Sequence, residues 1–263
     1  MGHVSIDMHG PVALLTLDAP PMNPLDRAMV ARLGERVAQC ARDARVRAVV
    51  LRGAGLRSFS VGSDLAELAG IVAQGREAIE EKFAQDEAVF GALAGLGKPT
   101  LAAIEGTAVG GGLELAVCCD LVLVGRSARL ALPEILLGAF PGSGGTLRIT
   151  RRVGPGRARR MMLLGDPVGV EESLAWGLVD HVVDDGRAVD EALALATRLA
   201  GGPALAIAAC KAAIDAALDQ PPSQALAFSR ERAVELAFST DLREGLDAFL
   251  GRRRPRFGAS EAE

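Results

Sequence analysis

Aromatic side chains and histidine are scarce in this 263-residue chain. It contains no tyrosine, one tryptophan and three histidines, and aromatic residues make up 3% of the sequence. Proteins that stack on single-stranded nucleic acid need aromatic rings in a basic groove, whereas this chain carries a net charge of −4. Three histidines are also too few for a histidine-rich metal centre. We therefore expect neither a nucleic-acid partner nor a metal site.

Cysteine is rare as well, and its spacing favours reduced thiols. The four cysteines, which form no C-x-x-C pair, are Cys40, Cys118, Cys119 and Cys210. The segment Met1–Asp7 lacks the basic start and apolar stretch of a secretory signal. The most apolar stretch, Leu113–Val124, is interrupted by Glu114 and Asp120, which indicates a buried core element and not a membrane span. We expect a cytoplasmic protein without a membrane partner.

The order of the predicted elements indicates an α/β fold. Strand and helix patterns alternate up to about residue 142, which is typical of an α/β core. The predicted strands are a hairpin at Val4–Asp18 and the segments Arg45–Arg52, Pro99–Ile104, Asp120–Val124 and Leu178–Val183. Asn23-Pro24 is expected to cap the first helix, and Ser63 or Asp64 the second, from Leu65. The helix that follows is expected to place Ile79, Phe83, Phe90 and Leu93 on one face.

The last sixty residues read as a separate helical region. Gly201-Gly202-Pro203 divides a core of residues 1–200 from a region of residues 201–263. The three predicted helices are Ala204–Leu218, Ser223–Phe238 and Asp241–Gly251. Asp241 and Glu244 have the spacing of a capping box at the start of the last helix. Because this region is small for an independent core, we expect it to dock on its own or a neighbouring subunit.

Glycine, in contrast, is abundant, with 31 residues. Three glycines stand together in VGGGLE at 109–114, between a predicted strand and a predicted helix. Bare N–H groups at a helix start suit a phosphate or the oxyanion of a carbonyl under attack. Glu114 lies three residues after Gly111 and so faces the same side of the first turn. The alternative is that the glycines permit close packing and Glu114 only complements the helix dipole.

A second carboxylate follows in LPE at 132–134, before the glycine-rich loop FPGSGGT at 140–146. Taken alone, Pro133 followed by Glu134 is an ordinary first turn of a helix. If Glu134 lay beside Glu114, the two carboxylates could hold one water molecule and act as base and acid.

Several segments in order resemble the crotonase, or enoyl-CoA hydratase/isomerase, superfamily. They are FSVGSDL (59–65), KPTLAAIEGTAVGGGLELAVCCDL (98–121), LPEILLGAFPGSGGTLRI (132–149), AWGLVDHVV (175–183) and LREGLDAFLGRRRPRF (242–257). The resemblance covers essentially the whole chain. It implies an α/β spiral of β-β-α turns with a C-terminal helical trimerisation region, assembled as a homotrimer or as a hexamer of two trimers. It also implies an acyl-CoA substrate and no cofactor beyond the CoA of that substrate.

The resemblance assigns roles to individual residues. The backbone N–H groups of Ser63 and Gly111 would hold the thioester oxygen, Glu114 would activate water, and Glu134 would protonate Cα. The residues that would contact CoA are Met22, Leu25, Val61, Gly62, Asp64, Leu65, Phe249 and Arg252. Phe249 and Arg252 would reach the CoA of a neighbouring subunit, although Arg252–Arg254 also reads as a solvated charge run.

The chain departs from the family pattern near the predicted thioester site. Ser63 stands where alanine or glycine is common, Val61 is bulkier than usual, and Ala66 replaces a frequent lysine. Neither carboxylate is lost, so the resemblance favours an enoyl-CoA hydratase. The alternatives are a double-bond isomerase, a thioester hydrolase or a decarboxylase on the same scaffold, or an acyl-CoA-binding oligomer without turnover.

Overall fold

The protein is built on two β-sheets. The structure is a computed structural model, and it describes residues 2–257. The larger sheet has the order β1-β2-β3-β5-β7-β9, and only its β1–β2 pair is antiparallel. Its strands are β1 (His3–His9), β2 (Val12–Asp18), β3 (Ala48–Gly53), β5 (Thr100–Ile104), β7 (Leu121–Gly125) and β9 (His181–Val183). The smaller, parallel sheet contains β4 (Ser58–Ser60), β6 (Thr107–Val109) and β8 (Arg129–Ala131).

The chain winds between the two sheets in a repeated order. Each turn places one strand in the larger sheet and the next in the smaller sheet, and then forms a helix. The helices that close these turns are α2 (Leu65–Gln74) with α3 (Arg76–Ala94), then α4 (Gly111–Ala116), and then the 3-10 helix η1 (Pro133–Leu137). This order confirms the predicted spiral of β-β-α turns.

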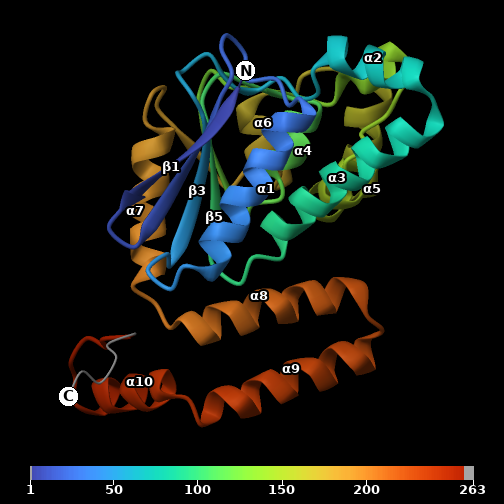
Figure 1. Cartoon of the computed structure of the whole chain (residues 1–263). Helices are drawn as coiled ribbons and strands as arrows, with labels where there is room; N and C mark the ends of the chain where they lie inside the picture. Colours follow the sequence, from blue (N-terminus) through green and yellow to red (C-terminus); the bar gives the residue numbers. More distant parts are fainter. Residues whose placement is uncertain (1, 258–263) are drawn as a thin grey trace.

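Helices cover both faces of the larger sheet, because its central strands are apolar on both sides (Figure 1). On one face, Leu15, Leu51 and Ala102 are register neighbours in the main core, which α1 (Arg27–Arg42) helps to cover. The other face packs against α7 (Ala188–Ala200). The buried residues of α7 are all alanine, so this helix can approach the sheet closely: Ala188, Ala192, Ala196 and Ala200.

The remaining helices all follow η1 along the chain. They are α5 (Gly145–Leu164), α6 (Val170–Trp176), α8 (Ala204–Asp219), α9 (Pro222–Ala237) and α10 (Thr240–Leu250). Figure 1 shows α8 and α9 side by side below the sheets, with α10 beyond them. Lys211 attaches α8 to the core, because its Nζ lies 2.7 Å from Oδ2 of Asp120 and 2.8 Å from the carbonyl oxygen of Lys98.

The C-terminal helices match the predicted ranges closely and expose apolar side chains. Phe238 and Phe249 are both 81% exposed in the single chain. Gly201 and Gly202 form the turn between α7 and α8. The division into residues 1–200 and 201–263, and the docking of the second region on a neighbouring subunit, stay predictions.

Two predicted helix caps are wrong. The first helix begins at Arg27, and its cap is Asp26, whose carboxylate accepts from the N–H of Met29. Asn23 instead sits at a φ of 53°, and its side-chain amide donates to the carbonyl oxygen of Ser58 at 2.8 Å. Tertiary hydrogen bonds from this side chain therefore replaced the local cap that the sequence suggested.

The cap of the last helix also differs from the predicted capping box. Ser239 caps α10 by accepting from the N–H of Leu242. Glu244 does not reach back to the helix start, because it forms a bidentate ion pair with Arg253. The carboxylate of Glu244 therefore binds Arg253, from the segment after the helix, and not a backbone N–H group at the helix start.

Within the described residues, none of the individual helices has both the length and the apolar composition needed to cross a membrane. Helices α7 and α8 meet that requirement only as a pair, with a bend of 108° between them.

The start of α4 lies directly against β4, and glycine makes this contact possible. A methyl group added at Gly112 would lie 2.3 Å from the carbonyl oxygen of Ser60, well inside van der Waals contact. Gly91, within α3, has no such restriction, because a methyl group there would meet nothing within 4 Å.

We therefore expect Gly112→Ala to lower the free energy of unfolding by about 1–3 kcal/mol, the usual cost of overpacking. Gly91→Ala is the matched control. It should leave stability unchanged or raise it by up to about 1 kcal/mol, because alanine is the better helix former. Urea unfolding followed by circular dichroism measures both. Equal unfolding midpoints for Gly112→Ala and the wild type would contradict the close contact.

Candidate active site

Two turns that contain glycine meet at the start of α4. Gly62, with a φ of 80°, lies so close to α4 that a methyl group on it would be 2.7 Å from the backbone nitrogen of Gly111. A methyl group on Gly111 would in turn lie 3.6 Å from the backbone nitrogen of Ser63. The backbone nitrogens of Ser63 and Gly111, predicted as a pair, are thus neighbours in space.

The N–H groups of this pair have no role in the secondary structure. Ser63 forms a parallel bridge with Leu25, but the two bonds of that bridge use the N–H groups of Leu25 and Asp64. Gly111 is the first residue of α4, where an N–H has no partner within the helix. Among residues 2–257, neither N–H donates to another protein atom. Both are available to a ligand oxygen.

Glu114 follows on the same helix and is buried, with 3% of its surface exposed. Its Oε1 accepts from the N–H of Ser143 at 2.9 Å and from the N–H of Gly145 at 2.8 Å. Burial, with a smaller contribution from the nearby Glu134, raises the pKa of this carboxyl to about 7 even though the two N–H donors oppose the rise. A group with such a pKa can accept or release a proton near neutral pH.

Glu134 lies in η1 and points its carboxyl group toward the start of α4. A methyl group on Gly110 would be 3.2 Å from Oε1 of Glu134, and one on Gly111 would be 3.9 Å from Oε2 of Glu114. The two carboxyl groups therefore converge on adjacent residues of one turn.

The carboxyl group of Glu134 has no partner within the described part of the chain. Both oxygens are buried, and neither forms a hydrogen bond there. Burial raises the pKa of Glu134 above its usual value. A buried carboxyl without a donor favours the protonated form, which can donate a proton. The site thus combines a hydrogen-bonded carboxyl, an unpaired carboxyl and two free N–H groups.

Five of the residues predicted to contact CoA form one wall beside the N–H groups of Ser63 and Gly111: Met22, Leu25, Val61, Gly62 and Leu65. The N–H of Val61 donates to the carbonyl oxygen of Met22 at 3.2 Å, and that of Leu25 to the carbonyl oxygen of Gly62 at 2.8 Å. Leu65, which begins α2, is 57% exposed. The segments 22–25 and 61–65 therefore lie side by side next to the N–H groups of Ser63 and Gly111.

Asp64, the sixth residue of this group, already has a structural role. Its side chain caps α2 by accepting from the N–H groups of Ala66 and Glu67. This confirms one of the two caps that the sequence offered and leaves Ser63 free to make other contacts.

Phe249 and Arg252 lie apart from this cluster. Figure 1 shows α10 at the opposite end of the protein from α2. Both side chains are exposed, and Arg252 has a φ of 50°. Within this chain they do not join the site, so contact with the CoA of a neighbouring subunit stays a prediction.

A buried ion pair beside the site was missed by the sequence analysis. Lys82 and Asp86 of α3 are each 5% exposed, with 2.5 Å between Nζ and Oδ2. The sequence pattern predicts Phe83 on the buried face of this helix, but Phe83 is 38% exposed. A face at 82, 86, 90 and 93 has equally good helical spacing, but it requires two buried charges, so hydrophobicity argued against it.

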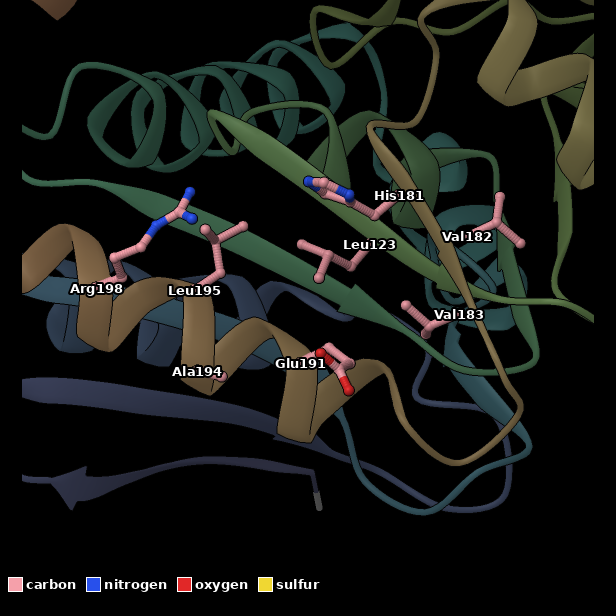
Figure 2. A pocket seen from close by; sticks show the side chains of 8 residues that line it. All are labelled: Leu123, His181, Val182, Val183, Glu191, Ala194, Leu195 and Arg198. Carbon is pink, nitrogen blue, oxygen red and sulfur yellow. The ribbon is translucent and has the colours of Figure 1, made fainter.

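A separate cavity of about 340 Å³ lies between the edge strand β9 and α7 (Figure 2). His181, Glu191 and Arg198 contribute its polar lining. None of the predicted site residues lines this cavity. In the part of the chain that the structure covers, no group of three His, Cys, Asp or Glu side chains is arranged to hold a metal ion.

Comparisons with known proteins give the family that the sequence resembles, and they cover nearly the whole chain. The family model described as enoyl-CoA hydratase/isomerase matches residues 7–260. The chain is similar to the short-chain-enoyl-CoA hydratase of Clostridium acetobutylicum, with 32% identity over 97% of both chains.

Solved structures agree. Pseudomonas aeruginosa DspI has a TM-score of 0.91 and 38% identity, over 97% of this chain and 96% of that one. An enoyl-CoA hydratase from Bacillus anthracis has a TM-score of 0.92 and 30% identity, over 98% of this chain and 100% of that one. With its β-β-α spiral, its paired N–H groups and its two convergent carboxyls, the chain belongs to the enoyl-CoA hydratase/isomerase family.

Proposed function

We propose that the protein is an enoyl-CoA hydratase, which adds water across the 2,3 double bond of an acyl-CoA thioester. One observation carries this proposal: two buried carboxyl groups, Glu114 and Glu134, converge beside the free N–H groups of Ser63 and Gly111. Hydration needs both halves of this site, because a base must activate water and an acid must supply the proton to carbon.

The N–H pair stabilises the charge that the reaction creates. When water attacks Cβ, the π electrons move onto the thioester oxygen and form an enolate. In the proposed complex, that oxygen accepts from the N–H groups of Ser63 and Gly111. Loss of one donor at such a site typically costs about 3–4 kcal/mol of transition-state stabilisation. Because the donors belong to the backbone, their positions are fixed before the substrate arrives.

The two carboxyl groups handle the protons. Glu114 takes a proton from the water molecule as the water oxygen bonds to Cβ, and Glu134 gives a proton to Cα. The N–H groups of Ser143 and Gly145 hold Oε1 of Glu114, so Oε2 is left to face the water. Glu134, which is buried without a hydrogen-bond donor, is suited to begin the reaction protonated.

The substrate's CoA would run along the wall formed by Met22, Leu25, Val61, Gly62 and Leu65. We propose that Phe249 and Arg252 complete the CoA site of a neighbouring subunit in a homotrimer or a hexamer. Their exposure and their distance from the site within one chain support this arrangement. A cytoplasmic location is part of the same proposal, and the four free thiols are compatible with it.

We expect Glu114→Gln and Glu134→Gln each to lower kcat for the hydration of crotonyl-CoA by about 100-fold or more, the usual contribution of an acid or a base. Loss of absorbance at the enoyl-thioester band measures the rate. Glu87→Gln, an exposed change on α3, is the control and should keep wild-type activity.

The same assay separates the alternatives. Full hydration by either variant would rule out the model with two carboxyl groups. If the protein were an isomerase, which needs only one base, Glu114→Gln would retain activity on a 3-enoyl-CoA. A wild-type protein that binds enoyl-CoA esters of several lengths without any loss of absorbance would be a binding protein and not a hydratase.

The raised pKa of Glu114 also predicts how stability depends on pH. The folded value of about 7 exceeds the unfolded value of 4.5, so the folded state holds this proton more tightly. The stability that it contributes is present below pH 4.5 and is lost as the pH rises through 7. Glu114→Gln removes this loss of stability, because the amide does not titrate.

At pH 8, Glu114→Gln should raise the free energy of unfolding by up to about 3 kcal/mol, and at pH 4 the substitution should have little effect. Urea unfolding at the two pH values checks this, and an equal effect at both would contradict it.

A further inference from the structure

A chain of hydrogen bonds connects the two halves of the site through α3. Lys82 Nζ lies 3.2 Å from Oγ of Ser63 and 2.5 Å from Oδ2 of Asp86. The same Oδ2 accepts from Oγ of Ser143 at 2.7 Å, and the N–H of Ser143 donates to Oε1 of Glu114. The residue that presents one oxyanion N–H is thus connected to the carboxylate that is proposed to activate water.

We propose that the buried Lys82–Asp86 ion pair is a positioning device that fixes the spacing between the oxyanion turn at Ser63 and the loop that holds Glu114. The proposal rests on the hydratase function argued above. Neither charged group needs to touch the substrate. Lys82 would act on the N–H of Ser63 through the hydroxyl of that residue, and Asp86 would act on Glu114 through Ser143.

The energetics of burial support a positioning role. Two buried charges lose most of their hydration, and a buried ion pair is often no more stabilising than apolar side chains of the same size. The pair is therefore a costly way to stabilise α3, whose other buried residues include Phe90 and Leu93. Both charged groups direct their remaining hydrogen bonds at Ser63 and Ser143, the two ends of the site.

Packing around the pair restricts the same loop. The ammonium group of Lys82 lies 4.8 Å from the centre of the Phe83 ring. That ring would be 2.9 Å from a methyl group added at Gly142, next to Ser143. Helix α3 therefore contacts the loop at two adjacent residues, once through Phe83 and once through Asp86.

The smallest test is Ser143→Ala, which removes the hydroxyl but leaves both charges and the backbone N–H in place. The loop is then no longer tied to α3, and the N–H bonds to Oε1 of Glu114 weaken. These bonds lower the pKa of Glu114, so its pKa should rise above the wild-type value of about 7. The charged groups that surround this carboxyl are unchanged: Glu134 from η1, Asp86 and Lys82 from α3, and Arg148 from α5.

The pKa of Glu114 can be read directly by carbon NMR of protein labelled at the glutamate carboxyl groups, with the signal assigned from its absence in Glu114→Gln. This titration does not depend on turnover. If the wild-type protein hydrates no enoyl-CoA ester, the proposed function is wrong, whereas the titration still decides the role of the ion pair.

The kinetic test replaces both charges together in Lys82→Met/Asp86→Asn, so that no unpaired charge stays buried. We expect kcat for crotonyl-CoA to fall about 10- to 100-fold, because small displacements of catalytic groups have effects of this size. KM should change less than about twofold, since neither substituted residue belongs to the CoA wall, and the melting temperature should stay within a few degrees. Glu80→Gln, which breaks the exposed i,i+4 pair with Arg76 on the same helix, is the control and should match the wild type.

A wild-type pKa and kcat in Ser143→Ala would overturn the proposal. A lowered melting temperature with an unchanged kcat in the double variant would also overturn it, because the pair would then serve only stability. If the double variant does not fold, Ser143→Ala decides the question alone.

Discussion

The close approach of two glycine-containing turns is the constraint on which the rest of the site depends. A side chain on Gly62 would collide with the backbone of Gly111, so glycine at position 62 lets the two backbones approach, and Gly112 lets α4 lie directly on β4. This contact places two unpaired N–H groups next to each other at the positive end of a helix. It also points Glu114, one turn along the same helix, toward the same space. The same backbone packing therefore brings the N–H groups of Ser63 and Gly111 together and orients the carboxyl group of Glu114.

The carboxyl groups of the site are placed at a cost in stability. Glu114 is buried beside Glu134, and both pKa values are raised by that burial. The protein offsets part of the cost with the N–H groups of Ser143 and Gly145, which stabilise the charged form of Glu114. Glu134 receives no such donor within the described residues. In the proposed mechanism, this asymmetry distinguishes the base, Glu114, from the acid, Glu134.

Most of the fold could be predicted from the sequence because its signals are local. The apolar strands, the three C-terminal helices and the Asp64 cap all follow from short-range patterns that tertiary contacts did not override. The caps at Asn23 and Asp241 failed for a different reason. Asn23 donates to the carbonyl oxygen of Ser58, 35 residues away. The last helix is capped by Ser239, and Glu244 pairs with Arg253 from the segment after the helix. Local spacing carries no information about such partners.

The sequence by itself determined the family, the α/β spiral and the identity of Glu114, Glu134, Ser63 and Gly111 as candidate site residues. Only the tertiary structure decided that these groups converge and that, among residues 2–257, Glu134 has no hydrogen-bond donor. The structure also revealed Lys82 and Asp86 inside the core. Charged residues on a helix are assigned to the solvent face because burial of an isolated charge is unfavourable. Here the two charges are buried because they pair with each other and because each also bonds a hydroxyl group. Lys82 bonds that of Ser63, 19 residues away, and Asp86 bonds that of Ser143, 57 residues away. Only the folded chain brings these groups together.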